Sequence, residues 1–216
     1  MDSDIANGLI QYLMLVSLLT FHEFGHAWMV TKCGDDTARL SGRLSLNPIV
    51  HIDPIGTVLL PMLMIFLPGA GRFLIGWAKP VPFNYHNLGN PPRDEVLIAM
   101  AGPGMNVILA VLLVAAARGL QFFSSGEASI FCLQAAGLSL ILCFFNLIPV
   151  PPLDGSHVLR VVTNMSFEAY AQFARFGFII VIVLLQVRPF RELLTNVTFG
   201  TLFLLMRIFG VANGFT

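Results

Sequence analysis

The sequence predicts an all-α polytopic membrane protein, on three observations. Hydrophobic residues make up 56% of the 216 residues and charged residues only 11%, whereas soluble domains carry about 25% charged residues. The mean hydropathy is +0.79. Long uncharged runs recur along the chain, and a run of roughly 18 or more residues is enough for a helix to cross the bilayer core. A soluble domain and a disordered chain are both excluded, because neither tolerates this composition.

The charge balance and the cysteines narrow the expected partners. Twelve basic and twelve acidic residues cancel, which argues against a nucleic-acid partner and leaves the lipid bilayer as the expected surroundings. Cys33, Cys132 and Cys143 form no C-x-x-C pair and no disulfide framework. The last two lie in apolar runs, where we interpret them as small hydrophobic fillers.

Five apolar runs account for the expected membrane spans. The first run is preceded by Asp2 and Asp4 rather than by basic residues. We therefore expect it to remain a membrane helix and not to be a cleaved signal peptide, which needs a basic flank. The five runs cover residues 5–30, 96–117, 129–153, 171–187 and 193–208.

Residues 54–71 are harder to interpret. The segment is uncharged and long enough to span, but Pro54, Pro61 and Pro68 interrupt it. Proline removes a helical hydrogen bond, and irregular backbone at membrane depth survives only against protein or water. We favour a partial or re-entrant element over a full span, which gives about five to six transmembrane helices. The polar segment before it allows short strands at about 39–53.

The segment His22-Glu23-Phe24-Gly25-His26 has the form H-E-x-x-H. Residues four apart share a helix face, so both imidazoles can bind one ion. Glu23 lies next to that face, where its carboxylate can contact a water bound to the ion. Zinc accepts such nitrogen ligands. An ionisable residue at the bilayer centre costs about 2.5–3.5 kcal/mol, so these three are expected to face the protein interior. The alternative is a helix end at the interface, where they would simply meet water.

Zinc needs a further protein ligand. Asp154 is a candidate because it follows a long apolar run broken by Pro149, Pro151 and Pro152, and a carboxylate after a broken membrane helix suggests a functional site. It could equally cap the next helix. From residue types alone, the candidates are Cys33, Asp35, Asp36, His51, Asp53, His86, Asp154 and His157.

Two motifs together resemble the site-2 protease family of intramembrane zinc metalloproteases, peptidase family M50. They are H-E-F-G-H at 22–26 and N-L-I-P-V-P-P-L-D-G at 146–155. Three further motifs resemble the minimal bacterial branch, which we expect to lack a PDZ or CBS domain. These are G-R-L-S-L-N-P at 42–48, H-I-D-P-I-G-T at 51–57 and G-W-A-K-P-V-P at 76–82.

The resemblance implies a ligand set and a base. His22, His26 and Asp154 would hold one Zn²⁺ ion, and Glu23 would be the general base. Asn146 lies eight residues before the ligand aspartate, as the family pattern requires. Its amide could hold the scissile carbonyl or the substrate backbone, or it could form a helix–helix hydrogen bond.

Asn106 is a weaker candidate for substrate contact. It ends A-G-P-G-M-N at 101–106, which resembles the family's A-G-P-x-x-N element. Gly104 stands where a bulkier residue is more usual. The alternative is that the glycines of this element mark close helix packing.

The resemblance implies a zinc-dependent endopeptidase that cleaves a transmembrane segment of a membrane-protein substrate. We expect one membrane-embedded metalloprotease domain over residues 1–216, with a catalytic core at about 5–160 and additional helices at about 170–210. The alternative is a membrane zinc transporter or carrier that uses the same ligands, although the sequence contains no inverted repeat. A prenyl-protein protease would take a glutamate as third ligand, and we find no such element.

The ligand positions also predict a topology. The histidines come late in the first run and Asp154 follows the third, so these ends share a side if an even number of crossings separates them. The second and third runs supply two crossings, which leaves 54–71 as a partial insertion. This arrangement collects basic residues on one side, which favours the cytoplasm. We therefore expect a multi-pass protein of the bacterial plasma membrane, with an outside N-terminus and an active site nearer the cytoplasmic side.

Overall fold

The computed structural model describes residues 2–66, 76–123 and 126–211. This part of the chain is helical and contains no β-strand, which confirms the predicted all-α class. The chain divides into two compact units, residues 1–94 and 95–216. The boundary falls in the first turn of one long helix, α4, at Pro91–Phe122.

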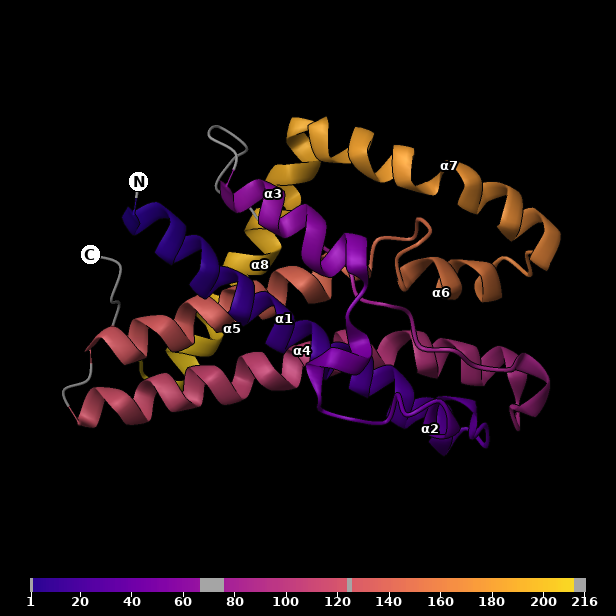
Figure 1. Cartoon of the computed structure of the whole chain (residues 1–216), viewed down its shortest axis with the longest axis horizontal. Coiled ribbons are helices and arrows are strands. Elements are labelled where there is room, and N and C mark those ends of the chain that lie inside the picture. The colour runs from indigo at the N-terminus through magenta and orange to yellow at the C-terminus, as the bar shows by residue number, and fades with distance from the viewer. Residues whose placement is uncertain (1, 67–75, 124–125, 212–216) are drawn as a thin grey trace. The chain divides into compact units, whose positions relative to one another are not determined.

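The first unit is built on one long helix, α1, at Asp2–Lys32. Three short elements contact α1: α2 at Thr37–Leu40, the 3₁₀-helix η1 at Pro48–His51 and α3 at Leu60–Phe66. Figure 1 shows α3 beside α1. The described part of this unit also contains the π-helix η2 at Pro54–Leu59 and the 3₁₀-helix η3 at Tyr85–Asn87.

The second unit is a bundle of long helices. It contains most of α4, then α5 at Gly126–Asn146, α6 at Gly155–Val162, α7 at Phe167–Gln186 and α8 at Arg188–Phe209. Helices α4 and α5 run side by side (Figure 1), and α8 shares their core. Small and branched residues meet there, because they let the backbones approach closely. That core includes Ala110, Val114, Ala136, Leu140, Leu202 and Met206.

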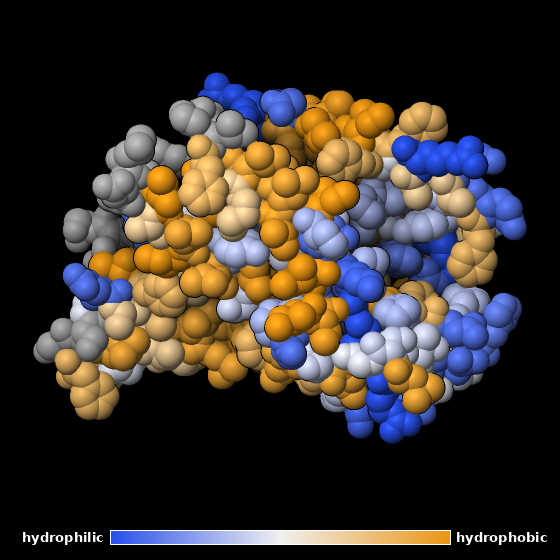
Figure 2. Space-filling view, in the orientation of Figure 1, coloured by the Kyte–Doolittle hydropathy of each residue, from blue (hydrophilic) through white to orange (hydrophobic). Residues whose placement is uncertain are grey.

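Among the described residues, five helices are long and apolar enough to cross a membrane: α1, α4, α5, α7 and α8. They match the five predicted runs. Large apolar side chains remain exposed on these helices, including Leu13, Leu112 and Phe176 at 64%, 59% and 62%. Apolar residues cover broad areas of the surface in Figure 2. Such a surface fits contact with lipid tails, since water would oppose it.

The segment predicted as partial or re-entrant is a short apolar helix over Pro54–Phe66. Asp53 begins it, because its Oδ1 accepts hydrogen bonds from the backbone N–H groups of Ile55 and Gly56 at 3.0 and 2.7 Å. At about 1.5 Å per residue, this helix reaches about 20 Å, short of a bilayer core of about 30 Å. The described part therefore favours a partial element. Residues 67–71 of the predicted segment lie outside the described residues.

The prediction of short strands at about 39–53 is wrong. This region holds the end of α2 and the 3₁₀-helix η1. Pro48 has no N–H for a strand ladder, and the Asn47 side chain accepts from the backbone N–H of Ile49 at 3.1 Å. These local hydrogen bonds and the fixed φ of proline favour a turn of helix over an extended pair.

Asp35, a candidate ligand from residue types alone, is instead the centre of a buried polar cluster. It is fully buried, and its carboxylate accepts four hydrogen bonds. Thr37 donates two, and Asn84 and Asn87 donate one each from a distant segment. Burial opposes ionisation, but these donors outweigh it and hold the pKa of Asp35 below its ordinary value. Asp35 therefore ties residues 35–37 to residues 84–87.

We expect Asp35→Ala to lower the free energy of unfolding by at least about 2 kcal/mol at pH 7, because several buried donors lose their acceptor. A lowered pKa gives stability that is present above the unfolded value of about 3.9 and is lost as pH falls below it. Thermal unfolding of both proteins at pH 7 and near pH 3 tests this. The difference in stability between the wild type and Asp35→Ala should be smaller near pH 3 than at pH 7. Asp36→Ala is the control, since Asp36 forms an exposed pair with Arg39; an equal loss in both variants would contradict the assignment.

Candidate metal centre

The two histidines of the H-E-x-x-H motif face each other on α1. His22 and His26 are buried, at 4% and 8% exposure, and their Nε2 atoms lie 3.0 Å apart. The rings meet edge to face, with centroids 4.7 Å apart. Two nitrogen ligands of one tetrahedral zinc would lie about 3.3 Å apart. The pair therefore fits two ligands of a single ion, and the interface alternative, in which these side chains meet water, is not what the structure shows.

Glu23 is also buried, at 8% exposure, and has a charged neighbour. The guanidinium of Arg43 interacts electrostatically with the Glu23 carboxylate. Burial lowers the pKa of Arg43, and the negative charge of Glu23 opposes that shift. Arg43 was not among the residues that the sequence proposed for the site. Its place in the motif at 42–48 was the sign that it has a specific role.

The three loop motifs of the first unit form one assembly. The Arg43 guanidinium donates to the carbonyl oxygens of Val50 and Lys79. The backbone N–H of Lys79 donates to the carbonyl of His51 at 2.9 Å. Gly56 makes the assembly possible, because a Cβ there would lie 2.3 Å from the ring of Trp77. The motifs at 42–48, 51–57 and 76–82 therefore build a single support, and one of its residues, Arg43, interacts with Glu23.

Asp154 lies in the second unit, at the N-cap position of α6. Its side chain makes no capping hydrogen bond to that helix. The capping alternative from the sequence is therefore not what the structure shows. One carboxylate oxygen, Oδ2, is fully buried, and the residue as a whole is half-buried.

The proline-rich loop before Asp154 is tightly packed at two glycines. A Cβ at Gly155 would lie 2.2 Å from the carbonyl oxygen of Leu147, and one at Gly177 would lie 2.0 Å from that of Pro151. The Pro151–Pro152 peptide bond is cis. Only glycine, which has no Cβ, permits the close contacts at positions 155 and 177. The loop is therefore fixed against its own start and against α7.

The two asparagines predicted for substrate contact lie in the second unit. The side-chain amide of Asn146 donates to the carbonyl of Leu142 on its own helix at 2.9 Å. Asn106 is fully buried on α4, and its backbone carbonyl accepts from the Ser139 hydroxyl at 2.8 Å. A Cβ at Gly104 would meet nothing within 4 Å, so this glycine is not there for close packing. Substrate contact by Asn146 and Asn106 stays a prediction.

Three other candidate ligands make hydrogen bonds elsewhere in the fold. Asp53 begins the π-helix, and the imidazole of His51 donates from Nε2 to the carbonyl of Ser45 at 2.8 Å. His157 contacts Glu95 in the second unit. His51 is buried at 2% exposure, and His157 is half-buried.

Comparison with known proteins agrees with this fold and motif set. The model of peptidase family M50 matches residues 10–128 and 121–186. A protein of Bacillus subtilis, "Putative zinc metalloprotease YwhC", is 38% identical over 82% of this chain and 80% of its own length. Two proteins called Rip2, with the same description, are 35% and 34% identical. The one from Mycolicibacterium smegmatis matches over 77% of this chain and 62% of its length, and the one from Mycobacterium tuberculosis over 92% and 73%. No solved structure matches.

The fold and the motif define a class of protein: a polytopic helical membrane protein whose H-E-x-x-H motif is buried on a long helix. The chain belongs to peptidase family M50, which confirms the resemblance to the site-2 proteases. It is a metalloprotease, so the carrier alternative is not supported. The relatives themselves are described as zinc metalloproteases.

Proposed function

We propose that this chain is a zinc-dependent intramembrane endopeptidase that cleaves a membrane-spanning segment of another membrane protein. The observation that carries the proposal is the position of the H-E-x-x-H motif. It lies on α1, which is long and apolar enough to cross a membrane, and its ionisable residues are buried. Intramembrane ionisable residues are costly, and they mark functional sites. Because the motif is buried, the peptide bond of the substrate that is to be cleaved must enter the protein interior to reach it.

His22, His26 and Asp154 are the residues proposed to hold one zinc ion. His22 and His26 are buried in the first unit with their Nε2 atoms 3.0 Å apart, and Asp154 lies at the start of α6 in the second unit. Two imidazole nitrogens and one carboxylate oxygen match the donors that catalytic zinc takes from proteins, with a further position left open. Zinc, when bound, supplies a Lewis acid that polarises a carbonyl and favours deprotonation of water.

Glu23 is proposed as the general base. It would accept a proton from the attacking water and then deliver that proton to the amine of the leaving peptide. Burial keeps bulk water away from this carboxylate, and the charge of Arg43 compensates it. Asn146 is proposed to hold the scissile carbonyl or the substrate backbone, and Asn106 to contact the substrate. An extended substrate segment is expected, because helical peptide bonds are shielded by their own hydrogen bonds.

Removal of metal tests the proposed function. Purified protein in lipid vesicles, with a single-span membrane protein as substrate, should lose cleavage after treatment with a strong chelator. One equivalent of zinc should restore it, because the ligands belong to the folded chain. Helical content, followed by circular dichroism, should stay unchanged throughout. Full cleavage by the metal-free protein would rule out the zinc-dependent mechanism.

The active site is proposed to lie nearer the cytoplasmic side of the cell membrane. Exposed positions before α4 and after it allow a test. In a variant without its three native cysteines, Asn90→Cys should react only from the cytoplasm, and Glu127→Cys only from outside. Both residues are exposed. Labelling intact cells with an impermeant maleimide separates the two sides. Labelling of Asn90→Cys from outside would overturn this orientation.

A further inference from the structure

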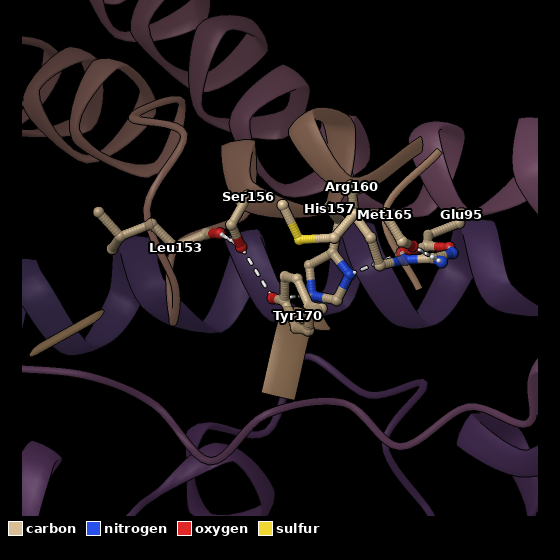
Figure 3. A network of polar contacts seen from close by, with 7 residues as sticks. All are labelled: Glu95, Leu153, Ser156, His157, Arg160, Met165 and Tyr170. Carbon is tan, nitrogen blue, oxygen red and sulfur yellow. Dashed lines mark hydrogen bonds and ion pairs between the residues drawn. The ribbon is translucent and has the colours of Figure 1, made fainter. Parts of the chain in front are cut away.

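A buried ion pair in the second unit plays no part in the proposed chemistry. The carboxylate of Glu95 on α4 accepts from Nε and Nη2 of Arg160 on α6. The Glu95 and Arg160 side chains are 2% and 8% exposed. His157 Nδ1 lies 3.0 Å from the same carboxylate. Figure 3 shows the three side chains converging.

The network continues from His157 to the residue before Asp154. The Tyr170 hydroxyl on α7 lies 3.4 Å from His157 Nε2 and 2.8 Å from the Ser156 hydroxyl. Ser156 also lies 2.6 Å from the carbonyl oxygen of Leu153, to which it donates (Figure 3). Polar contacts therefore hold the chain on both sides of Asp154.

The rotation of α6 determines where Asp154 points, because Asp154 is the residue from which this helix begins. The helix is only eight residues long, so polar contacts on one of its faces contribute strongly to fixing its rotation. His157 and Arg160 are three residues apart and lie on the same face of α6. Both side chains bind Glu95, so this face is turned toward Glu95. A guanidinium that binds both carboxylate oxygens also fixes its direction, which a single hydrogen bond cannot do.

Stability alone is a poor explanation for this pair. Removing two charges from water offsets much of their attraction, and apolar replacements of buried pairs are often as stable. An ion pair that orients a functional group contributes to function even where it adds little to stability. Groups beyond the ligands commonly change metal affinity by about 10–100-fold.

We propose that Glu95 is a positioning residue: through Arg160 and His157 it sets the orientation of α6, and thereby the direction of the Asp154 carboxylate toward its metal ion. This inference rests on the proposed function, because it takes Asp154 as a zinc ligand. Glu95 itself touches neither substrate nor metal.

The test measures zinc affinity of the full chain in detergent by competition with a chromogenic chelator. Glu95→Gln keeps the shape of the side chain and removes its charge. We expect zinc to bind at least about tenfold more weakly, kcat to fall, and KM to stay the same. Glu192→Gln is the matched control, since Glu192 forms an exposed pair with Arg188 at 2.7 Å. The control should match the wild type in zinc affinity, kcat and KM.

A double variant separates orientation from stability. Glu95→Met with Arg160→Met leaves no buried charge without a partner, so the fold should survive. Zinc affinity should remain reduced, because the directional contacts are gone. Wild-type zinc affinity and kcat in either folded variant would overturn the positioning role, and so would failure of both variants to fold. If the wild type itself bound no zinc, the proposed function would fail instead.

Discussion

Replacing Glu23 with glutamine is expected to lower kcat by about 10²–10⁴-fold while one zinc ion stays bound. Glutamine has nearly the same shape, but its amide cannot accept the proton from the attacking water. The ligand histidines would keep their places, since both belong to the same uninterrupted helix. Cleavage of a single-span substrate in vesicles, with zinc measured on the same samples, checks both parts of this expectation.

Glu127→Gln is the control for that experiment. It makes the same chemical change at an exposed residue in the first turn of α5. Its kcat should equal that of the wild type. Turnover by Glu23→Gln near the wild-type rate would show that another group takes the proton. Loss of zinc from Glu23→Gln would instead point to a ligand role for the carboxylate.

Replacing Asp154 with alanine is expected to remove zinc, with affinity falling more than about 100-fold. The change deletes one of three proposed protein ligands, which should exceed the effect of groups outside the ligand set. Cleavage should be lost in parallel. Metal analysis of protein dialysed against a weak chelator measures the first effect, and the vesicle assay measures the second.

Asp36→Ala is the matched control, because its carboxylate is exposed and pairs with Arg39. It should keep one zinc ion and wild-type cleavage. Unchanged zinc content in Asp154→Ala would mean that the third ligand lies elsewhere, even if cleavage were lost. Helical content should be compared in both variants, so that unfolding is not mistaken for loss of a ligand.

The long helices could be predicted from the sequence because length and composition decide them. A run of apolar residues without charge has few alternatives to a spanning helix. The histidine pair was equally predictable, since residues four apart on a helix are neighbours whatever surrounds them. Local rules failed at residues 39–53, where Pro48 and the Asn47 side chain replace strand pairing with a 3₁₀-helix.

The supporting residues could not be found by local rules. Arg43 binds the carbonyl of Lys79, and Glu95 binds Arg160, partners 36 and 65 residues apart in the sequence. Neither contact leaves a periodic signal. A charged residue beside an apolar run looks the same in the sequence whether it is solvated or buried. Only the folded structure shows that both residues are buried.

The most direct test of the account is X-ray absorption at the zinc edge of the purified, zinc-loaded protein. We predict one zinc per chain, bound by two imidazole nitrogens and otherwise by oxygen ligands, all at about 2.0–2.2 Å. A sulfur ligand at about 2.3 Å, or a third imidazole, would contradict it, because the chain also contains three cysteines and three further histidines that could serve instead.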